Sequence, residues 1–437
     1  MEMTTYRIMP SAVQGKVPVP SSKSMGHRMC ICAGLSESGC IVDNIAISQD
    51  IEATNRCLQG LGIKVKEVSS QFAGRTAFQY KRQEFAGGAV TLDCGESGST
   101  LRFFIPLGAL CNVPVTFAGR GKLVSRPLQP YYDIFDRQGL RYRTGENGRL
   151  PLTVAGRLQP GAYALPGDIS SQFVSGLLFA LPLLEEDSSL EILPPLESAS
   201  YIDLTVSSLE QFGIEIIRTD KLHYRIPGRQ RYQAPADRVQ VEGDWSQAAF
   251  WLVAGAVGSD VSLECVGLSA STLQGDRAVL RILRDMGAEI TETDTALLVR
   301  PSRLHGCVID AADCPDLVPV LSVAAAVAEG TTRIINAGRL RIKECDRLAA
   351  MHAELQKLGA GITEEPEGLL IQGRPEGLAG GAVTDAWNDH RIAMSMAVAA
   401  LACKAPVTLT GGESVGKSYP AFWNDYAAVG GKAAVIE

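Results

Sequence analysis

Three short stretches of the sequence combine charged and small polar residues at spacings that suit the binding of anions. In the first, Pro20-Ser-Ser-Lys23-Ser24, small polar residues precede an apolar run. That pattern predicts a helix N-terminus, where free N–H groups and the helix dipole attract anions. The charge of Lys23 is unfavourable at the positive end of the helix dipole unless an anion binds there. Arg28 lies near the same face of the predicted helix. The residues alone leave a second interpretation open, a solvated basic pair.

The second stretch runs from Arg339 to Arg347 and contains four cations and two carboxylates. Its lysine and its last arginine are spaced i,i+4, and its glutamate and that arginine i,i+3, so a helix would bring them together. By itself the stretch is typical of a surface ion-pair network, which adds little stability. Joined to Asp316 and to Asn388-Asp389-His390-Arg391, it predicts an acid–base cluster with anion clamps.

The third stretch, Gly411 to Ser418, fits the phosphate-loop pattern GxxxxGK[ST]. We reject a nucleoside triphosphatase function, because too little chain follows the motif for the next strand and for the aspartate that would bind Mg²⁺. Pro420 would also fall within the first turns of the helix that the motif requires. Lys417 remains a candidate for contact with a phosphate group.

The helix-start pattern of the first stretch occurs six times. One residue from each copy serves as its anchor, and neighbouring anchors are 70 to 75 residues apart. The anchors are Ser24, Ser99, Ser171, Ser246, Asp316 and Asp389. Amphipathic stretches keep the same period, and each ends in the glycine expected of a helix C-cap. These glycines are Gly62, Gly139, Gly213, Gly287, Gly359 and Gly430. The two markers predict six copies of a subdomain with two helices and several strands.

The repeat also predicts the domains. Three copies per half is the natural division. The strand before Pro20 falls outside the first copy, and we expect it to complete the C-terminal half of the chain. The predicted domains are residues 20–240, and residues 1–19 together with residues 241–437.

Composition narrows the class of protein. The formal net charge of −7 makes a general nucleic-acid-binding surface unexpected. The 11 cysteines include no CxxC pair, which favours small buried thiols in a reducing compartment over disulfides or a metal site. The first residues lack an apolar signal core, and the longest apolar runs are too short to cross a membrane. We therefore expect a cytoplasmic protein with no nucleic-acid or membrane partner.

Further motifs occur in order along the chain and cover essentially its whole length. They are Pro20-Ser-Ser-Lys23-Ser24 with Arg28, Gly98-Ser99 with Arg102, Arg126-Pro127, Ile169-Ser170-Ser171-Gln172-Phe173, Ser198 with Tyr201-Ile-Asp-Leu-Thr205, Glu242-Gly-Asp244, Pro315-Asp316, Lys343-Glu344-Cys-Asp-Arg347-Leu, Asn388-Asp-His-Arg391 and Lys417-Ser-Tyr-Pro420. Each motif is weak to moderate alone. In this order, on a sixfold repeat, the chain resembles the EPSP synthase (3-phosphoshikimate 1-carboxyvinyltransferase) family.

The resemblance implies a fold of class α/β (α+β), a two-domain inverted α/β barrel. Each domain would have three βαβαββ repeats with buried parallel helices, and the active site would lie in the cleft between the domains. The implied reaction moves the enolpyruvyl group of phosphoenolpyruvate to the 5-hydroxyl of shikimate 3-phosphate and releases phosphate, on the route to chorismate and aromatic amino acids. The family needs no metal or cofactor. We expect a monomer whose partners are these two anionic substrates, which suit cations placed at helix starts.

Site residues are carried over motif by motif, as the resemblance implies. Shikimate 3-phosphate would be bound by Lys23, Ser24, Arg28, Ser170, Ser171, Gln172, Ser198, Asp316 and Lys343, with Arg339 as a further candidate. Phosphoenolpyruvate would be bound by Lys23, Gly98, Arg126, Gln172, Arg347, Arg391 and Lys417. Asp316 would act as base on the 5-hydroxyl, and Glu344 would carry the proton at the methylene carbon. Lys23 would stabilise charge and shuttle a proton.

Two positions depart from the family pattern. Glu96 stands where an asparagine is common, and it adds negative charge near an anion site. Arg339 stands where some members have an asparagine that contacts shikimate 3-phosphate.

Two other functions were weighed. UDP-N-acetylglucosamine 1-carboxyvinyltransferases share the fold, but they usually have an asparagine after the first-site lysine and a reactive cysteine in a flexible loop. Here Ser24 follows Lys23, and the segment Gly119–Arg126 has no cysteine. A non-catalytic phosphate-binding relative would be expected to lose the carboxylates, whereas Asp316 and Glu344 are present.

The charge pattern leads to a first prediction. Six helix N-termini that face one cleft should repel one another until anions fill it, so the ligand-free protein should be open. Small-angle scattering with and without both ligands measures this. The radius of gyration should fall when the ligands bind, and an unchanged radius would count against the prediction.

Overall fold

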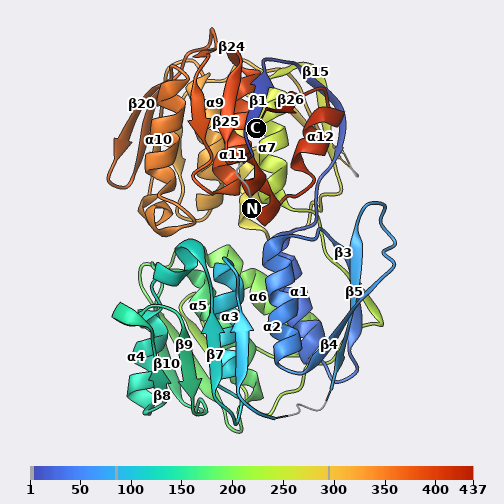
Figure 1. Ribbon diagram of the computed structural model, residues 1–437, viewed down its shortest axis with the longest axis vertical. Coiled ribbons are helices and arrows are strands. Elements are labelled where there is room, and N and C mark those ends of the chain that lie inside the picture. Colours follow the sequence, from blue (N-terminus) through green and yellow to red (C-terminus); the bar gives the residue numbers. More distant parts are fainter. Residues whose placement is uncertain (1–3, 84–86, 294–295, 437) are drawn as a thin grey trace. The chain divides into compact units, whose positions relative to one another are not determined.

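The computed structural model describes residues 4–83, 87–293 and 296–436 (Figure 1). The chain folds into two compact units. One is Lys23–Val241, and the other combines the N-terminal segment up to Ser22 with the chain from Glu242 onward. The first is the middle unit, and the second is the terminal unit.

Each unit contains three four-stranded sheets with one topology. The first strand of each sheet is parallel to the second, and the third and fourth follow antiparallel. In the middle unit the sheets, in spatial order, are β14 (Arg238–Gln240), β3 (Cys40–Ile45), β5 (Thr76–Arg82) and β4 (Ile63–Val68); β6 (Val90–Asp93), β7 (Val115–Ala118), β9 (Leu152–Ala155) and β8 (Arg141–Arg143); and β10 (Ala162–Pro166), β11 (Ser188–Leu193), β13 (His223–Ile226) and β12 (Ile217–Arg218).

The terminal unit repeats this topology three times. Its sheets are β2 (Val13–Pro18), β15 (Ser259–Val266), β17 (Ala296–Val299) and β16 (Ile290–Glu292); β18 (Val308–Asp310), β19 (Thr331–Ile335), β21 (Gly368–Gln372) and β20 (Gly361–Glu365); and β23 (Val383–Asp385), β25 (Val407–Thr410), β1 (Tyr6–Met9) and β26 (Lys432–Val435). A small parallel pair joins β22 (Leu378–Gly380) to β24 (Cys403–Ala405).

Two helices accompany each sheet. The first helices of the six repeats are α1 (Lys23–Leu35), α3 (Gly98–Gly108), α5 (Ser171–Ala180), α7 (Trp245–Val257), α9 (Val318–Ala326) and α11 (His390–Leu401). The second helices are α2 (Gln49–Gly60), α4 (Gln129–Gln138), α6 (Ala199–Gln211), α8 (Ala278–Asp285), α10 (Arg347–Lys357) and α12 (Phe422–Ala428).

The two units exchange strands. This exchange explains why β1 and β2, the strands at the start of the chain, fall outside the first repeat. Strand β2 leads into α1 of the middle unit, yet it pairs in parallel with β15 of the terminal unit. Strand β14 leads into α7 of the terminal unit, yet it pairs in parallel with β3 of the middle unit. Strand β1 completes the last sheet between β25 and β26. The first repeat of each unit therefore obtains its full set of strands only because the chain crosses twice between the units.

The predicted helix starts are capped as expected in four repeats. The side chains of Ser97, Ser170, Asp244 and Asp389 each accept a backbone N–H from the first turn of the helix that follows. Asp316 differs, because it lies in the 3₁₀ turn Pro315–Leu317, where no side chain acts as a cap. Its carboxylate instead pairs with arginine side chains, as described below.

The six predicted helix-ending glycines are confirmed. All of them have left-handed φ angles, between 65° and 100°. An L-residue with a side chain is strained there, so glycine ends these helices at the lowest cost.

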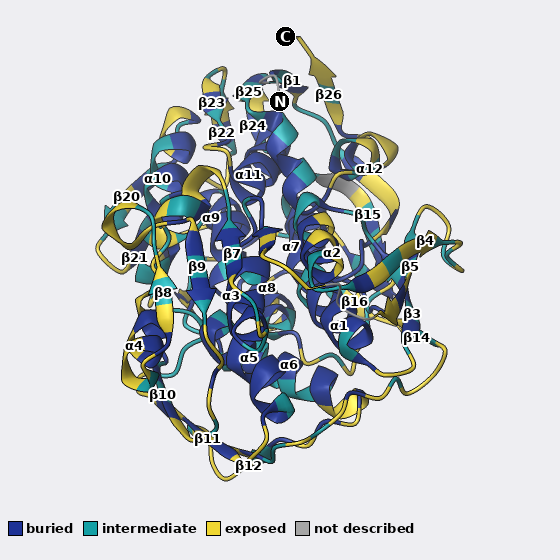
Figure 2. Ribbon diagram, turned by 60° about the horizontal axis from the view of Figure 1, so that its bottom comes forward, coloured by how far each residue is buried: buried dark blue, intermediate teal, exposed yellow. Residues whose placement is uncertain are grey.

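The first helices fill the two cores. Every residue of α9 and α11 is buried, as is every residue of α7 except the last (Figure 2). In the middle unit α3 packs against α5. All eleven cysteines are free thiols and nine are buried, as predicted from the sequence. Within the described ranges, no helix has both the length and the apolar character needed to span a bilayer.

The left-handed glycines give a stability prediction. At Gly139, φ is 65° and an added Cβ would meet nothing within 4 Å, so backbone strain is the main cost of Gly139→Ala. We expect a loss of about 1 kcal/mol, seen as a fall of about 2–4 °C in the thermal unfolding midpoint.

Gly139→Asn is the matched control, because asparagine tolerates left-handed backbone and should lose less. Equal losses of stability in the two variants would show that the left-handed φ of residue 139 is not the cause of the destabilisation.

Candidate active site

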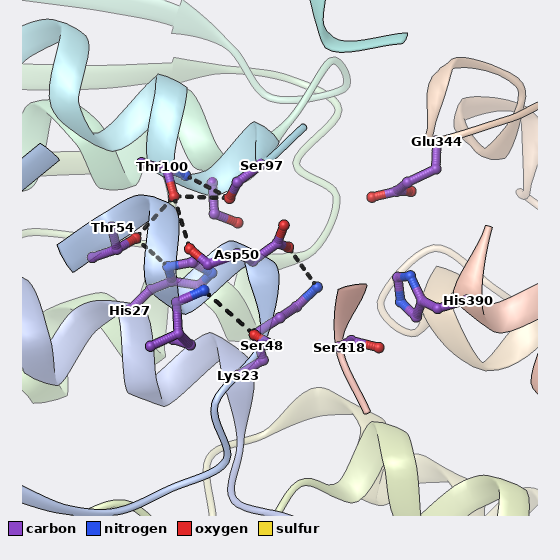
Figure 3. Close-up of polar contacts among 12 residues, drawn as sticks. Lys23, His27, Ser48, Asp50, Thr54, Ser97, Thr100, Glu344, His390 and Ser418 are labelled. Atoms are coloured by element: carbon purple, nitrogen blue, oxygen red, sulfur yellow. Dashed lines mark hydrogen bonds and ion pairs between the residues drawn. The ribbon is translucent and has the colours of Figure 1, made fainter. Parts of the chain in front are cut away.

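In the middle unit, Lys23 begins α1 and is held by a carboxylate from the next helix. Its Nζ lies 2.9 Å from Oδ2 of Asp50, in the first turn of α2 (Figure 3). The two side chains are 18% and 15% exposed, so the pair is shielded from water more than most surface ion pairs. Sequence reasoning missed Asp50, because an acid in the first turn of a helix has an ordinary explanation in the helix dipole.

A buried polar chain joins residues from the first two turns of α1, α2 and α3. His27 Nδ1 lies 2.7 Å from Thr54 Oγ1, and Thr54 Oγ1 lies 2.8 Å from Thr100 Oγ1 (Figure 3). The Thr100 hydroxyl also donates to Ser97 Oγ at 2.8 Å. Burial, reinforced by Lys23 and Arg28, holds the pKa of His27 well below its usual range, so this imidazole is neutral. The chain fixes the N-terminal ends of α1, α2 and α3 against one another.

The starts of α3 and α5 meet around Gly98. Gln172 Oε1 accepts a hydrogen bond from Arg102 Nη1 at 2.7 Å, and its Nε2 donates to Ser99 Oγ at 3.0 Å. A Cβ added at Gly98 would collide with the guanidinium of Arg126 and lie 3.1 Å from Arg102 Nη1. The predicted residues Gly98, Arg126 and Gln172 are therefore brought together, and Arg102 joins them.

Arg28 is buried, with 2% of its surface exposed. Its guanidinium donates to Thr205 Oγ1 at 2.9 Å and to the carbonyls of Ser24 and Tyr201 at 2.7 and 2.8 Å. Burial lowers its pKa to about 10, which leaves it charged at neutral pH. Arg28 thus ties the start of α1 to α6, and direct contact with a ligand stays a prediction.

The predicted serines lie at helix starts. Ser24 is the second residue of α1, Ser170 caps α5, and Ser171 begins it. Ser198 precedes α6 with a left-handed φ of 55° and is buried. A non-glycine residue held in that conformation is over-determined by its surroundings, as functional residues often are.

In the terminal unit, one buried guanidinium holds three carboxylates. Arg347, at the start of α10, is 2% exposed. Its Nη1 donates to Asp316 Oδ1 at 2.8 Å, its Nη2 to Glu344 Oε2 at 2.7 Å, and its Nε to Asp389 Oδ2 at 2.7 Å. The two carboxylates predicted to move protons, Asp316 and Glu344, are therefore fixed on one cation.

Further cations surround Asp316. Arg391 Nη2 lies 3.3 Å from Asp316 Oδ2, and Lys343 Nζ lies 3.8 Å from Oδ1. Burial by itself would raise the pKa of Asp316, but its neighbours hold it well below the usual range; in order of effect they are Arg391, Lys343 and Arg347. Burial, with Arg347 and Arg339 in the same direction, lowers the pKa of Lys343 to about 8. The site thus keeps Asp316 ionised.

Lys417 and Arg339 are held by backbone carbonyls. Lys417 Nζ donates to the carbonyl of Asn388 at 2.8 Å, and Arg339 Nη2 donates to the carbonyl of Ala312. The phosphate-loop motif forms a 3₁₀ helix, Gly412–Lys417, and not the start of a long α-helix. This geometry agrees with the rejection of a nucleoside triphosphatase.

A further acid was missed from the sequence. Asp276 lies in a 3₁₀ turn before α8 and is 5% exposed, and its Oδ1 has no hydrogen-bond partner among the described residues. Burial raises its pKa to about 7, and Asp316 adds to this effect while Arg391 opposes it. The sequence Gly-Asp-Arg looks like an exposed turn, so no local signal marked Asp276.

Among the residues that the structure describes, no group of three His, Cys, Asp or Glu residues is arranged to hold a metal ion.

These two clusters combine cations at helix starts with fixed carboxylates. The cations suit phosphate and carboxylate groups, since helix N-termini and guanidinium groups favour anions. The carboxylates Asp316 and Glu344 provide groups that can accept and return protons.

Comparisons with known proteins agree with this chemistry. The family model for EPSP synthase (3-phosphoshikimate 1-carboxyvinyltransferase) matches residues 8–426. A 3-phosphoshikimate 1-carboxyvinyltransferase of Clostridium novyi is 47% identical, with 98% of each chain covered, and one of Clostridioides difficile is 45% identical at the same coverage. An EPSP synthase structure from Acinetobacter baumannii has a TM-score of 0.82 at 26% identity, covering 99% of this chain and 100% of that one.

The structural similarity to the Acinetobacter baumannii EPSP synthase confirms the predicted fold class, the inverted α/β barrel of βαβαββ repeats. An enolpyruvyl transferase of Streptomyces tendae, NikO, shares the fold at 16% identity with a TM-score of 0.78. From the matched family model and the full-length relatives, the chain belongs to the EPSP synthase (3-phosphoshikimate 1-carboxyvinyltransferase) family.

Proposed function

We propose that the clusters of both units serve the single reaction of this family. The enzyme transfers the 1-carboxyvinyl group of phosphoenolpyruvate to the 5-hydroxyl of shikimate 3-phosphate and releases phosphate. The observation that carries the residue assignments is the buried Arg347, which holds Asp316 and Glu344 beside further cations. This arrangement offers proton-transfer groups and anion-binding groups together.

The reaction needs two opposite proton movements at one carbon. In the addition step, the 5-hydroxyl oxygen bonds to the enol carbon of phosphoenolpyruvate, the hydroxyl loses its proton, and the methylene carbon gains one. In the elimination step, the resulting methyl group gives a proton back, the carbon–oxygen bond to phosphate breaks, and the double bond forms again. One group must therefore act on oxygen, and another must act reversibly on carbon.

Asp316 is assigned as the base on the 5-hydroxyl. Its low pKa in the ligand-free protein makes it a weak base, because Arg391 and Lys343 stabilise its charge. Bound phosphate and carboxylate groups would share those cations, and the pKa of Asp316 would then rise toward the range useful for catalysis. Substrate binding would thus activate its own base.

Glu344 is assigned as the proton carrier at the methylene carbon. Arg347 Nη2 holds one of its oxygens at 2.7 Å, which orients the carboxylate without burying it fully. Lys23, held by Asp50, would stabilise developing charge and shuttle a proton.

The remaining predicted residues are assigned to binding. Phosphoenolpyruvate is assigned to Lys23, Gly98, Arg126, Gln172, Arg347, Arg391 and Lys417. Shikimate 3-phosphate is assigned to Lys23, Ser24, Arg28, Ser170, Ser171, Gln172, Ser198, Asp316, Arg339 and Lys343. Because one chain supplies all of them, we propose that a monomer is sufficient. Eleven free thiols favour a reducing cytoplasm as its location.

One assay tests the function. Phosphate release from phosphoenolpyruvate should occur with shikimate 3-phosphate as co-substrate and not with UDP-N-acetylglucosamine. Release with the nucleotide sugar alone, or with neither, would refute the assignment.

The proton-transfer roles give a prediction on rates. Glu344→Gln keeps the shape and an acceptor for Arg347 but removes the acid–base group, so kcat should fall by about 10²- to 10⁴-fold with little change in substrate Kd. Asp316→Asn should also damage kcat, with a larger loss of shikimate 3-phosphate affinity because Lys343 and Arg391 lose their carboxylate partner. Steady-state kinetics and equilibrium binding measure both effects. Near-normal kcat in both variants would contradict the assignment.

Gly98 gives a prediction on inhibition. A methyl group at Gly98 would press on the Arg126 guanidinium and crowd the assigned phosphoenolpyruvate site. Membership of the family implies that the herbicide glyphosate competes for that place. Its chain is one atom longer between the two acidic groups than that of phosphoenolpyruvate, so Gly98→Ala should raise its inhibition constant by about tenfold or more, equivalent to ~1.4 kcal/mol. The KM for phosphoenolpyruvate should rise less, and that for shikimate 3-phosphate should hardly change. Equal losses for phosphoenolpyruvate and glyphosate, or no loss of either, would show that Gly98 does not line the site.

A further inference from the structure

Helix α10 begins with Arg347 and carries a second buried charge two turns later. Glu354 lies seven residues on, on the same side of the helix, and it is 1% exposed. None of the roles assigned above involves it. A carboxylate buried this deeply needs hydrogen-bonding or charged partners, so its partners indicate what it does.

Two of the partners of Glu354 come from the end of β23 and the loop that follows it into α11. Its Oε1 accepts the indole Nε1–H of Trp387 at 2.8 Å, and its Oε2 accepts the backbone N–H of Asp385 at 3.0 Å. The third partner, Lys357 Nζ at 2.8 Å, comes from the same helix as Glu354 and is half exposed. The carboxylate therefore clamps residues 385–387 to α10.

The backbone of this loop depends on such a clamp. Trp387 and Asn388 have left-handed φ angles of 53° and 52°. Successive non-glycine residues hold this conformation only when surrounding contacts determine it. Burial does not hold Trp387, which is 37% exposed. Its bond to Glu354 and the hydrogen bond that its backbone N–H donates to Asp385 Oδ1 are two contacts that hold this residue.

The loop in turn places the groups assigned to phosphoenolpyruvate. The carbonyl of Asn388 accepts Lys417 Nζ at 2.8 Å. The next residue, Asp389, caps α11 and holds Arg347 Nε at 2.7 Å. If Asn388 relaxed to the right-handed region, its carbonyl would turn and Lys417 would lose this acceptor.

We propose that Glu354 is a positioning residue for the phosphoenolpyruvate site. Through Trp387 and Asn388 it sets where the Lys417 ammonium is held. The inference rests on the proposed function, in which Lys417 binds phosphoenolpyruvate. Glu354 itself exchanges no proton and touches no substrate.

Two variants of the full-length enzyme test this proposal. Glu354→Gln keeps the size but replaces one acceptor by an NH₂ group, so one of the two loop donors loses its partner. Trp387→Phe removes the indole N–H and makes the ring smaller, but the side chain is 37% exposed, so the risk for folding is small. Each should raise the KM for phosphoenolpyruvate by about two- to twelvefold, the range that corresponds to the net contribution of one typical hydrogen bond. The KM for shikimate 3-phosphate should stay within about twofold of the unmodified enzyme.

Lys357→Met is the matched control. It removes the third partner of Glu354 and leaves both bonds to the loop, so both KM values should stay unchanged. A merely structural role for Glu354 predicts a different result: the active fraction and kcat would fall, and the two KM values would not separate.

Combination with Lys417→Met shows whether the effect passes through Lys417. The proposal expects Lys417→Met to raise the KM for phosphoenolpyruvate and Glu354→Gln to add nothing further in that background. If Lys417→Met raises this KM but Glu354→Gln and Trp387→Phe leave it unchanged, or add their full effect, the inference is overturned and the proposed function stands. If Lys417→Met leaves the KM unchanged, the assigned role of Lys417 and the inference both fail.

Discussion

The terminal unit depends on one buried guanidinium. Arg347 is almost inaccessible to water, and three carboxylates satisfy its charge. A buried arginine without such partners would be strongly unfavourable, and so would the carboxylates without the arginine. The cluster therefore forms as a whole, and its geometry fixes Asp316 and Glu344, the two carboxylates that we propose as proton-transfer groups. Rigid placement of this kind is what a site needs when it must act on oxygen and on carbon in one cycle.

The repeat explains how the same physical device recurs. Each copy begins a buried helix with small polar or acidic residues, so its free N–H groups point out of an apolar core. Anions are the natural partners of such helix ends, and cations placed nearby add to the attraction. This accounts for a protein with a net charge of −7 that binds anions. The positive charge is local, and the overall charge stays negative.

Local signals made the fold predictable, and tertiary contacts limited the prediction of the site. Helix ends such as Gly139 and caps such as Ser97 and Asp244 follow rules that act within a few residues, so the sixfold period was readable. Asp50 and Glu354 were missed because Lys23 lies 27 residues from Asp50, and Asp385 and Trp387 lie 31 and 33 residues from Glu354. Each acid also has an ordinary explanation on its helix.

Arg28 shows that a motif can predict where a residue lies without predicting what its side chain contacts. The motif placed it near the start of α1, as the structure does, yet its donors are used inside the protein by Thr205, Ser24 and Tyr201. Residue type and spacing identify a neighbourhood. They do not decide which member of it faces the ligand, because that depends on packing against α6.

The central claim is that cations keep Asp316 ionised until substrate anions share them. The most direct measurement is the pKa of Asp316 by ¹³C NMR of carboxyl-labelled aspartate, with the resonance assigned by its loss in Asp316→Asn. The account predicts that in the ligand-free protein this carboxyl titrates well below the usual aspartate range. With shikimate 3-phosphate and inorganic phosphate bound, its pKa should move upward. An ordinary pKa in the free protein, or no upward movement when the two anions bind, would contradict the account.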